Sequence, residues 1–168
     1  MSGGSVTEDR LPVFRAPMRA RDRDLPQFEG ARFGVGHGLV GIGDALTEVP
    51  PTLTDAVAAA GTTHGEKAGR MLARFAELPD GVFVWTQTGD RTFRLGRVSG
   101  PWRYEESAAA REAGIHHVRP AEWLGAEIPL ERTPLAVIDT FARGGLNFQR
   151  INDTGAESET AKLFDSPA

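Results

Sequence analysis

The stretch GVFVWTQTGDRTFRLGRVSGPWRYEESAAAREAGIHHVRPAEW, residues 81–123, decides the fold of this chain. Residues 82–85 form a short continuous apolar run, which is typical of a strand buried on both faces. Thr88, Gly89 and Asp90 offer a turn before a second strand over 91–98, so we expect a hairpin. A small helical turn over 111–114 and a third strand over 115–122 follow.

We expect two helices before this stretch. Thr52 and Asp55 form a capping-box pattern ahead of 56–60, and Gly61 stands where a left-handed C-terminal cap is wanted. Thr63 and Glu66 repeat that signature ahead of a second helix. Four apolar residues at helical spacing give that helix one apolar stripe: Met71, Leu72, Phe75 and Leu78.

The remaining segments complete the map of the chain. Residues 31–42 are expected to be a glycine-studded strand followed by a loop. Thr133 caps and Pro134 opens a short helix through Phe141, which Gly144 and Gly145 end, and residues 147–151 return as a strand. We expect residues 1–30 to be an extended or flexible arm and residues 152–168 an acidic mobile tail. The predicted domain, 31–151, has an α+β fold: an open β-barrel or curved mixed sheet with helices packed at its ends.

Composition limits the possible functions. A chain of 168 residues with 40% hydrophobic and 25% charged residues is typical of one globular domain. A net charge of −4 argues against general polyanion binding, so any nucleic-acid role must rest on a local patch. One such patch sets four arginines against Asp90: Arg91, Arg94, Arg97 and Arg103. The absence of cysteine excludes thiolate metal sites, and no apolar run is long enough for a membrane span; we expect a soluble, cytoplasmic protein without a metal or cofactor.

All three tryptophans and the only tyrosine fall within residues 81–123, among arginines. Flat rings beside cations suit a flat polar guest such as a nucleobase. Trp102 and Tyr104 share strand parity and follow a Gly-Pro break, so both rings can face one side and stack on a base. By periodicity alone, Trp85 and Trp123 fit a hydrophobic core better than a pocket.

Residues 31–151 resemble the EVE branch of the PUA-like superfamily, which includes modified-base readers of modification-dependent restriction proteins and is related to YTH domains. The resemblance rests on two groups of residues: Gly96, Val98, Gly100, Trp102 and Tyr104, and then His117, Arg119, Pro120 and Trp123. His37 stands where the relatives often carry tryptophan. The resemblance implies a barrel-like fold whose pocket receives a flipped or single-stranded base, with methylated bases preferred.

This resemblance and the residue chemistry together give the candidate site. The expected base-binding residues are His37, Gly38, Asp44, Trp85, Ser99, Trp102 and Tyr104. The expected phosphate-binding residues are Arg94, Arg97, Arg103 and Arg119. Several of them have a structural alternative: a turn or helix cap for His37 and Asp44, the core for Trp85, and a solvated surface for the arginines. The expected partner is DNA or RNA with a modified base, and a separate nuclease or effector chain would supply any cleavage.

Competing chemistries fit the sequence less well. Gly36, Gly38 and Gly41 match the dinucleotide fingerprint G-x-G-x-x-G, but that motif requires an immediate helix and further βαβ units, and Pro50 follows too soon. The sequence contains no H-E-x-x-H, G-x-S-x-G or P-loop motif, so we expect a binding module and not an enzyme. The alternatives are a nucleotide-like small-molecule binder or small enzyme that uses the same pocket, and a protein-binding accessory subunit.

Overall fold

The computed structural model describes residues 11–19, 26–43, 45–145 and 147–166. The strands are β1 (Val13–Arg15), β2 (Leu39–Gly43), β3 (Phe83–Gly89), β4 (Thr92–Val98), β5 (Arg103–Tyr104), β6 (Ile115–Trp123) and β7 (Gln149–Arg150). The helices are α2 (Glu29–His37), α3 (Leu53–His64), α4 (Glu66–Glu77), α5 (Ala108–Ala113), α6 (Leu135–Ala142) and α7 (Thr154–Asp165), with a 3-10 turn at Leu130–Arg132.

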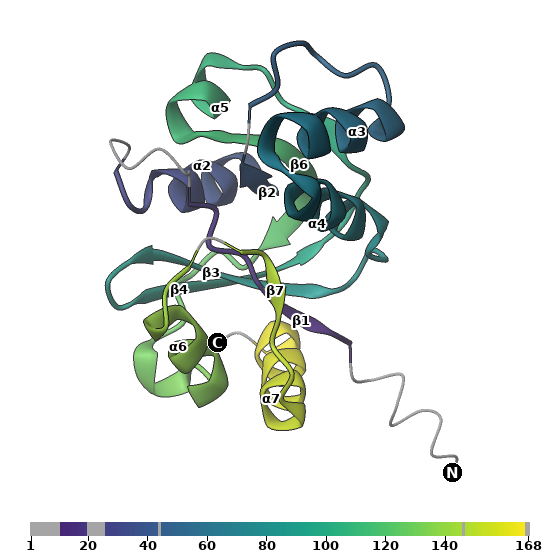
Figure 1. Cartoon of the computed structure of the whole chain (residues 1–168). Coiled ribbons are helices and arrows are strands. Elements are labelled where there is room, and N and C mark those ends of the chain that lie inside the picture. The colour runs from purple at the N-terminus through teal and green to yellow at the C-terminus, as the bar shows by residue number, and fades with distance from the viewer. Residues whose placement is uncertain (1–10, 20–25, 44, 146, 167–168) are drawn as a thin grey trace, which may run out of the picture.

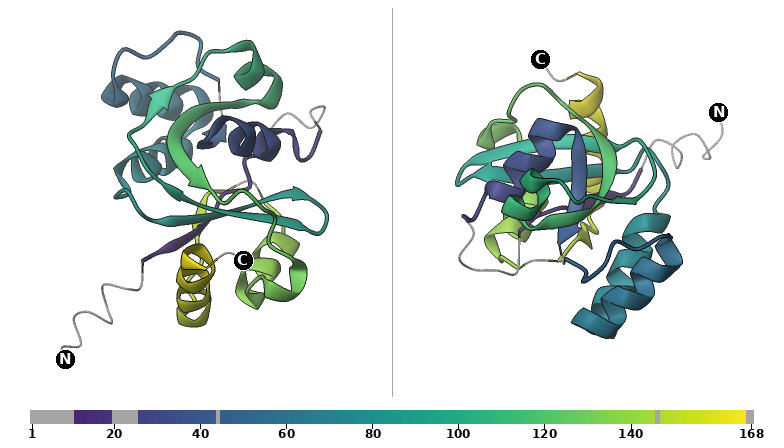
Figure 2. Two further views of the ribbon diagram at one scale, coloured as in Figure 1. Left: turned by 180° about the vertical axis from the view of Figure 1, so that it is seen from behind. Right: turned by 90° about the horizontal axis from the view of Figure 1, so that it is seen from above.

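The described strands form one mixed sheet in the order β2-β6-β4-β3-β1-β7, and β5 pairs with β6. β1 runs parallel to β3, and the other pairings are antiparallel. The sheet curls into a half-barrel, with α2, α3, α4 and α5 on one side and α6 and α7 on the other (Figure 1). Figure 2 shows the same curl from behind and from above. The predicted curved mixed sheet is therefore present, but its helices cover the two faces of the sheet, whereas they were expected at its ends.

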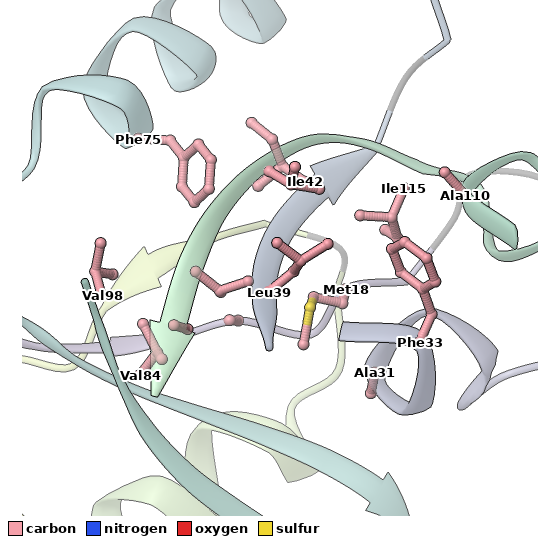
Figure 3. Close-up of a cluster of buried hydrophobic side chains, with 14 of the residues drawn as sticks. Met18, Ala31, Phe33, Leu39, Ile42, Phe75, Val84, Val98, Ala110 and Ile115 are labelled. Atoms are coloured by element: carbon pink, nitrogen blue, oxygen red, sulfur yellow. The ribbon is translucent and has the colours of Figure 1, made fainter. Parts of the chain in front are cut away.

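Two hydrophobic cores lie on the two faces of this sheet. Val82 and Val84 belong to the core under α2 and α4, whereas Phe83 and Trp85 belong to the core under α6 and α7. Figure 3 shows the first core, where Phe75 enters from α4 and Phe33 from α2. The prediction that residues 82–85 are buried on both faces is confirmed, because successive side chains of a strand point to opposite faces.

Most of the predicted elements are confirmed. The hairpin is β3–β4, the third strand is β6, and the backbone N–H of Asp55 donates to the Thr52 side chain at the start of α3. Gly61, however, does not end α3, which continues to His64 and is followed by Gly65 at φ 103°. The predicted last helix is α6, and positive-φ Gly144 and Gly145 follow it as expected. Thr133 does not cap it, because Pro134 is the N-cap residue and the Thr133 hydroxyl donates to the carbonyl oxygen of Pro129.

The prediction of a strand over 31–42 was wrong in its first half, which is helix α2. Glycine lowers helix propensity, but here the packing requires it. A Cβ on Gly30 would lie 1.8 Å from the carbonyl oxygen of Met18, so only glycine lets α2 approach that segment. The glycine fingerprint thus spans the end of a helix and the following strand, β2, which is the reverse of the strand–turn–helix order of a dinucleotide site.

Both predicted ends of the chain belong to the fold where the structure describes them. β1, within the expected arm, lies between β3 and β7. The expected tail forms α7, whose buried residues include Ala156, Thr160 and Leu163 at helical spacing. The Asp153 side chain accepts from the N–H of Ala156 and caps this helix. Although residues 152–168 are acidic in composition, α7 carries a narrow apolar stripe that packs against the second core.

Candidate ligand-binding site

A groove of about 710 Å³ lies between α4 and the edge of the sheet formed by β1 and β7. Its walls come from three segments that are far apart in the sequence: Phe14 in β1, residues 67–79, and residues 147–152. Figure 1 labels α4 and β7, from which residues on the two sides come. The volume falls within the range of about 300–1,000 Å³ that is usual for small-molecule and cofactor sites.

Three phenylalanine rings meet in the groove: Phe14 and Phe148 from the sheet side, and Phe75 from α4. The rings of Phe14 and Phe148 are nearly parallel, with centroids 5.1 Å apart and planes at 13°. Phe75 meets Phe148 edge-on at 5.1 Å and 79°. Phe75 is buried, whereas Phe14 and Phe148 are half-buried, so part of their surface is open to the groove. Strand alternation sets this arrangement, because Phe14 faces α4 while Val13 and Arg15 point the other way.

A buried arginine holds the loop that carries Phe148. Arg15 is 5% exposed and donates to the carbonyl oxygens of Thr140 (3.0 Å), Gly144 (2.9 Å) and Asn147 (3.1 and 3.2 Å). Burial lowers the pKa of Arg15, and Arg143 lowers it further. Because five donors in a rigid fork are spread over three carbonyls, the guanidinium fixes the turn between α6 and β7 and thereby the position of Phe148.

The opposite side of the groove is one face of α4. Lys67, Met71, Arg74 and Leu78 all line it, at spacings of four, three and four residues, which is one stripe of an α-helix. Lys67 and Arg74 are exposed, and neither forms an ion pair with another of the described residues. Glu77 adds one carboxylate near the end of the helix. This wall therefore alternates exposed cations with apolar side chains.

Polar side chains also line the groove. Asn147, Gln149 and Asn152 are exposed and line it, and each carries both a donor and an acceptor. Arg150 also lines it, but donates to Glu157 of α7 at 3.3 Å, where the carboxylate side chain is only 9% exposed. The groove thus combines aromatic faces, amides and cations.

Arg119, predicted to contact phosphate, has a structural role instead. It is 3% exposed and donates to the carbonyl oxygens of Gly100, Phe75 and Leu78 and to the carboxylate of Asp80 at 2.9 Å. Burial lowers the pKa of Arg119, and Asp80 opposes that shift. Two of its acceptors are carbonyls at the C-terminal end of α4, so this residue holds the cationic wall of the groove in place.

Trp85, predicted to bind a base, also has a structural role. Its side chain is fully buried, and its indole N–H donates to the hydroxyl of Thr160 in α7 at 3.1 Å. The ring lies in the core under α6 and α7, on the face of the sheet opposite to the groove. Successive side chains of β3 point to opposite faces of the sheet, so Phe83 and Trp85 lie on one face and Val84 on the other.

Trp102 and Tyr104 do come together, but at a different place. The Trp102 indole N–H donates to Nδ1 of His117 at 3.2 Å, and Tyr104 stacks on His116 with centroids 5.5 Å apart and planes at 16°. The Tyr104 hydroxyl accepts from the N–H of Leu46 at 3.0 Å. The polar ends of both rings are therefore used within the protein, and neither ring lines the groove.

The other predicted residues are dispersed. His37 is exposed beside a separate hollow of about 250 Å³ between α2 and α5, and its Nδ1 lies 2.8 Å from the Phe33 carbonyl oxygen. Gly38 ends α2 in the left-handed region, and the N–H of Ser99 donates to the carbonyl of Pro120. Asp44 lies outside the described residues.

The predicted phosphate-binding arginines each have a partner within the fold. Arg94 donates to the carbonyl of Leu124, Arg97 pairs with Glu122 and lies over the ring of Phe164, and Arg103 pairs with Glu105. Burial acts to raise the pKa of Glu105, but hydrogen bonds from Arg103 and Ser107 outweigh it and lower this pKa. None of the three arginines lines the groove.

Sequence reasoning missed the residues of the groove. The segment Asn147, Phe148, Gln149 and Arg150 places an aromatic ring among amides and a cation, and it was interpreted only as a returning strand. The α4 stripe was recognised by its apolar members, although Lys67 and Arg74 share that face. Lys67 and Arg74 stand at positions of the helix that would be expected to face the core. A cation at such a position is the signal that could have identified the α4 side of the groove.

Other kinds of site find no support in the part of the chain that the structure describes. Within it, no three His, Asp or Glu side chains gather as a metal site would require. The described helices are each too short or too polar to span a bilayer. No protein-family model matches the chain, and neither does any curated protein. The resemblance to EVE domains therefore stays a prediction.

Proposed function

We propose that the protein is a nucleic-acid-binding module that holds a modified, unpaired base in the groove between α4 and β7. The observation that carries the proposal is the pair of parallel, half-buried rings of Phe14 and Phe148 together with the cations Lys67 and Arg74, which have no ion-pair partner among the described residues. A base needs a flat apolar face, and its phosphate needs a cation. The groove offers both from opposite sides.

The energetics of such binding are favourable. Stacking of one base on an aromatic side chain contributes about 1–3 kcal/mol, and removing a base from a duplex costs a few kcal/mol. A base that is already unpaired avoids the second cost. The amides of Asn147, Gln149 and Asn152 can exchange hydrogen bonds with the polar edge of a base, and amide side chains suit adenine in particular.

A modified base is favoured by the apolar members of the α4 wall. Met71 and Leu78 line the groove between and beyond the two cations, and a methyl group on the base would gain contact with such side chains. The resemblance to EVE domains implies the same preference. The proposal includes a cytoplasmic location and a separate effector chain for any cleavage, since the assigned role is recognition.

A second candidate function is the binding of a free nucleotide-like metabolite. The volume of the groove, about 710 Å³, favours it because that space suits a whole small molecule as well as one base of a strand. The two candidates share the same aromatic and cationic walls and differ in whether the ligand continues beyond the groove.

The test of the proposed function is the Phe148→Leu substitution, which removes the aromatic face but keeps most of the apolar volume. Binding is measured by fluorescence polarisation with matched single-stranded oligonucleotides, with and without a methylated base. We expect wild type to prefer the methylated strand, Phe148→Leu to bind it about tenfold more weakly, and Phe148→Tyr to retain binding.

Two controls make this result specific. Phe141→Leu changes a phenylalanine that packs in the other core, and it should leave affinity unchanged. Thermal unfolding of each variant establishes that it is folded. Equal and negligible affinity of wild type for all strands, or equal binding by wild type and Phe148→Leu, would contradict the proposal.

A further inference from the structure

We propose that the natural ligand of the groove is a polynucleotide strand whose backbone runs along α4 and places separate phosphates at Lys67 and Arg74. This inference rests on the proposed function and deepens it by assigning the path of the backbone and the residues that contact two of its phosphates. The carrying observation is that two exposed cations on one face of α4 both line the groove.

The spacing of these cations favours two phosphates over one. Lys67 and Arg74 are seven residues apart, which is about 10 Å along a helix at 1.5 Å per residue. Met71 lies between them on the same stripe. A single phosphate beside either cation would leave the other without an anion, whereas successive phosphates of a strand can reach both.

Lys67 and Arg74 differ from neighbouring cations, which form ion pairs within the protein. Arg70, on the same helix but not in the groove, has Glu66 within 3.7 Å, and Arg150 has Glu157 within 3.3 Å. Lys67 and Arg74 have no such partner among the described residues. Their charge is thus available to a ligand.

Negative charge on the protein limits where the strand can bind. The chain carries a net charge of −4, so a polyanion is repelled by the protein as a whole and attracted only where cations gather. Glu77 lines the groove one turn beyond Arg74 and repels phosphate there. We therefore expect a short contact with two phosphates and not an extended non-specific footprint.

The experiment measures how affinity depends on salt for the full chain. Each phosphate neutralised on a single strand contributes about −0.7 to the slope of log K against log salt, so wild type should show about −1.4. Between 50 and 200 mM salt that slope is a loss of about sevenfold. Lys67→Ala and Arg74→Ala should each halve the slope, which leaves a loss of about threefold.

Arg70→Ala is the matched control, because it removes the same charge from the same helix outside the groove. It should leave the slope at the wild-type value. The probes are single-stranded DNA and RNA carrying the methylated base, and the corresponding nucleoside monophosphate. The DNA and RNA arms distinguish the two sources of the same phosphodiester chemistry.

Two results would overturn the inference while leaving base binding in the groove intact. One is that the nucleoside monophosphate binds as tightly as the strand while Phe148→Leu still weakens both. The other is that Lys67→Ala and Arg74→Ala keep the wild-type slope, or lose no more of it than Arg70→Ala does. If Phe148→Leu has no effect on any probe, the proposed function itself fails.

Discussion

At the scale of single residues, two buried arginines shape the groove without lining its ligand face. Arg15 ties β1 to the turn before β7, and Arg119 ties β6 to the end of α4. Both guanidinium groups donate mainly to backbone carbonyls and so fix the main chain, and Arg119 also donates to the carboxylate of Asp80. The aromatic wall and the cationic wall therefore each depend on one buried cation.

The Arg15→Lys substitution tests this role. A lysine keeps the charge but has a single ammonium head, which cannot reach the three carbonyls that the planar fork satisfies. We expect the free energy of unfolding in urea to fall by about 2–3 kcal/mol, because hydrogen bonds from a charged group contribute about 1.5–3 kcal/mol. The exposed Arg143→Lys is the control and should change it by less than about 0.5 kcal/mol. A loss as small as that of the control would show that Arg15 does not hold the turn.

At the scale of elements, β1 and α7 decide whether the sheet has two covered faces. β1 supplies Phe14 to the groove and Val13 to the opposite core, and α7 covers that core with Leu163 and holds Trp85 through Thr160. Neither element was predicted. β1 is only three residues long between Pro12 and Pro17, and α7 has a narrow apolar stripe in an acidic segment.

The Leu163→Ala substitution tests the contribution of α7. Leu163 is 8% exposed and packs in the second core, so its truncation should lower the free energy of unfolding by about 2–4 kcal/mol. The neighbouring Lys162→Ala is exposed and serves as the control. If α7 were a mobile tail, as its composition suggested, both variants would unfold at the wild-type urea concentration.

At the scale of the whole molecule, local patterns predicted the central sheet but not the site. The apolar run 82–85, the turn after it and the capping box at Thr52 specify structure through neighbours in the sequence, and those elements are confirmed. The second predicted capping box was wrong, because Thr63 lies inside α3 and α4 has Gly65 at its N-cap without a side-chain cap. The groove joins Phe14, α4 and residues 147–152, which only the tertiary fold brings together. The predicted tryptophans stand out by composition, but Trp85 is a core residue, and Trp102 and Trp123 both donate their indole N–H within the protein.

The most direct test of the central claim is a two-dimensional ¹H–¹⁵N NMR titration with a single-stranded oligonucleotide that carries the modified base. The three indole N–H signals report on Trp85, Trp102 and Trp123, none of which lines the groove. We predict that the backbone amides of Arg74, Phe148 and Gln149 shift on binding while all three indole signals stay in place. A shift of the Trp102 indole signal with unchanged groove amides would contradict the account.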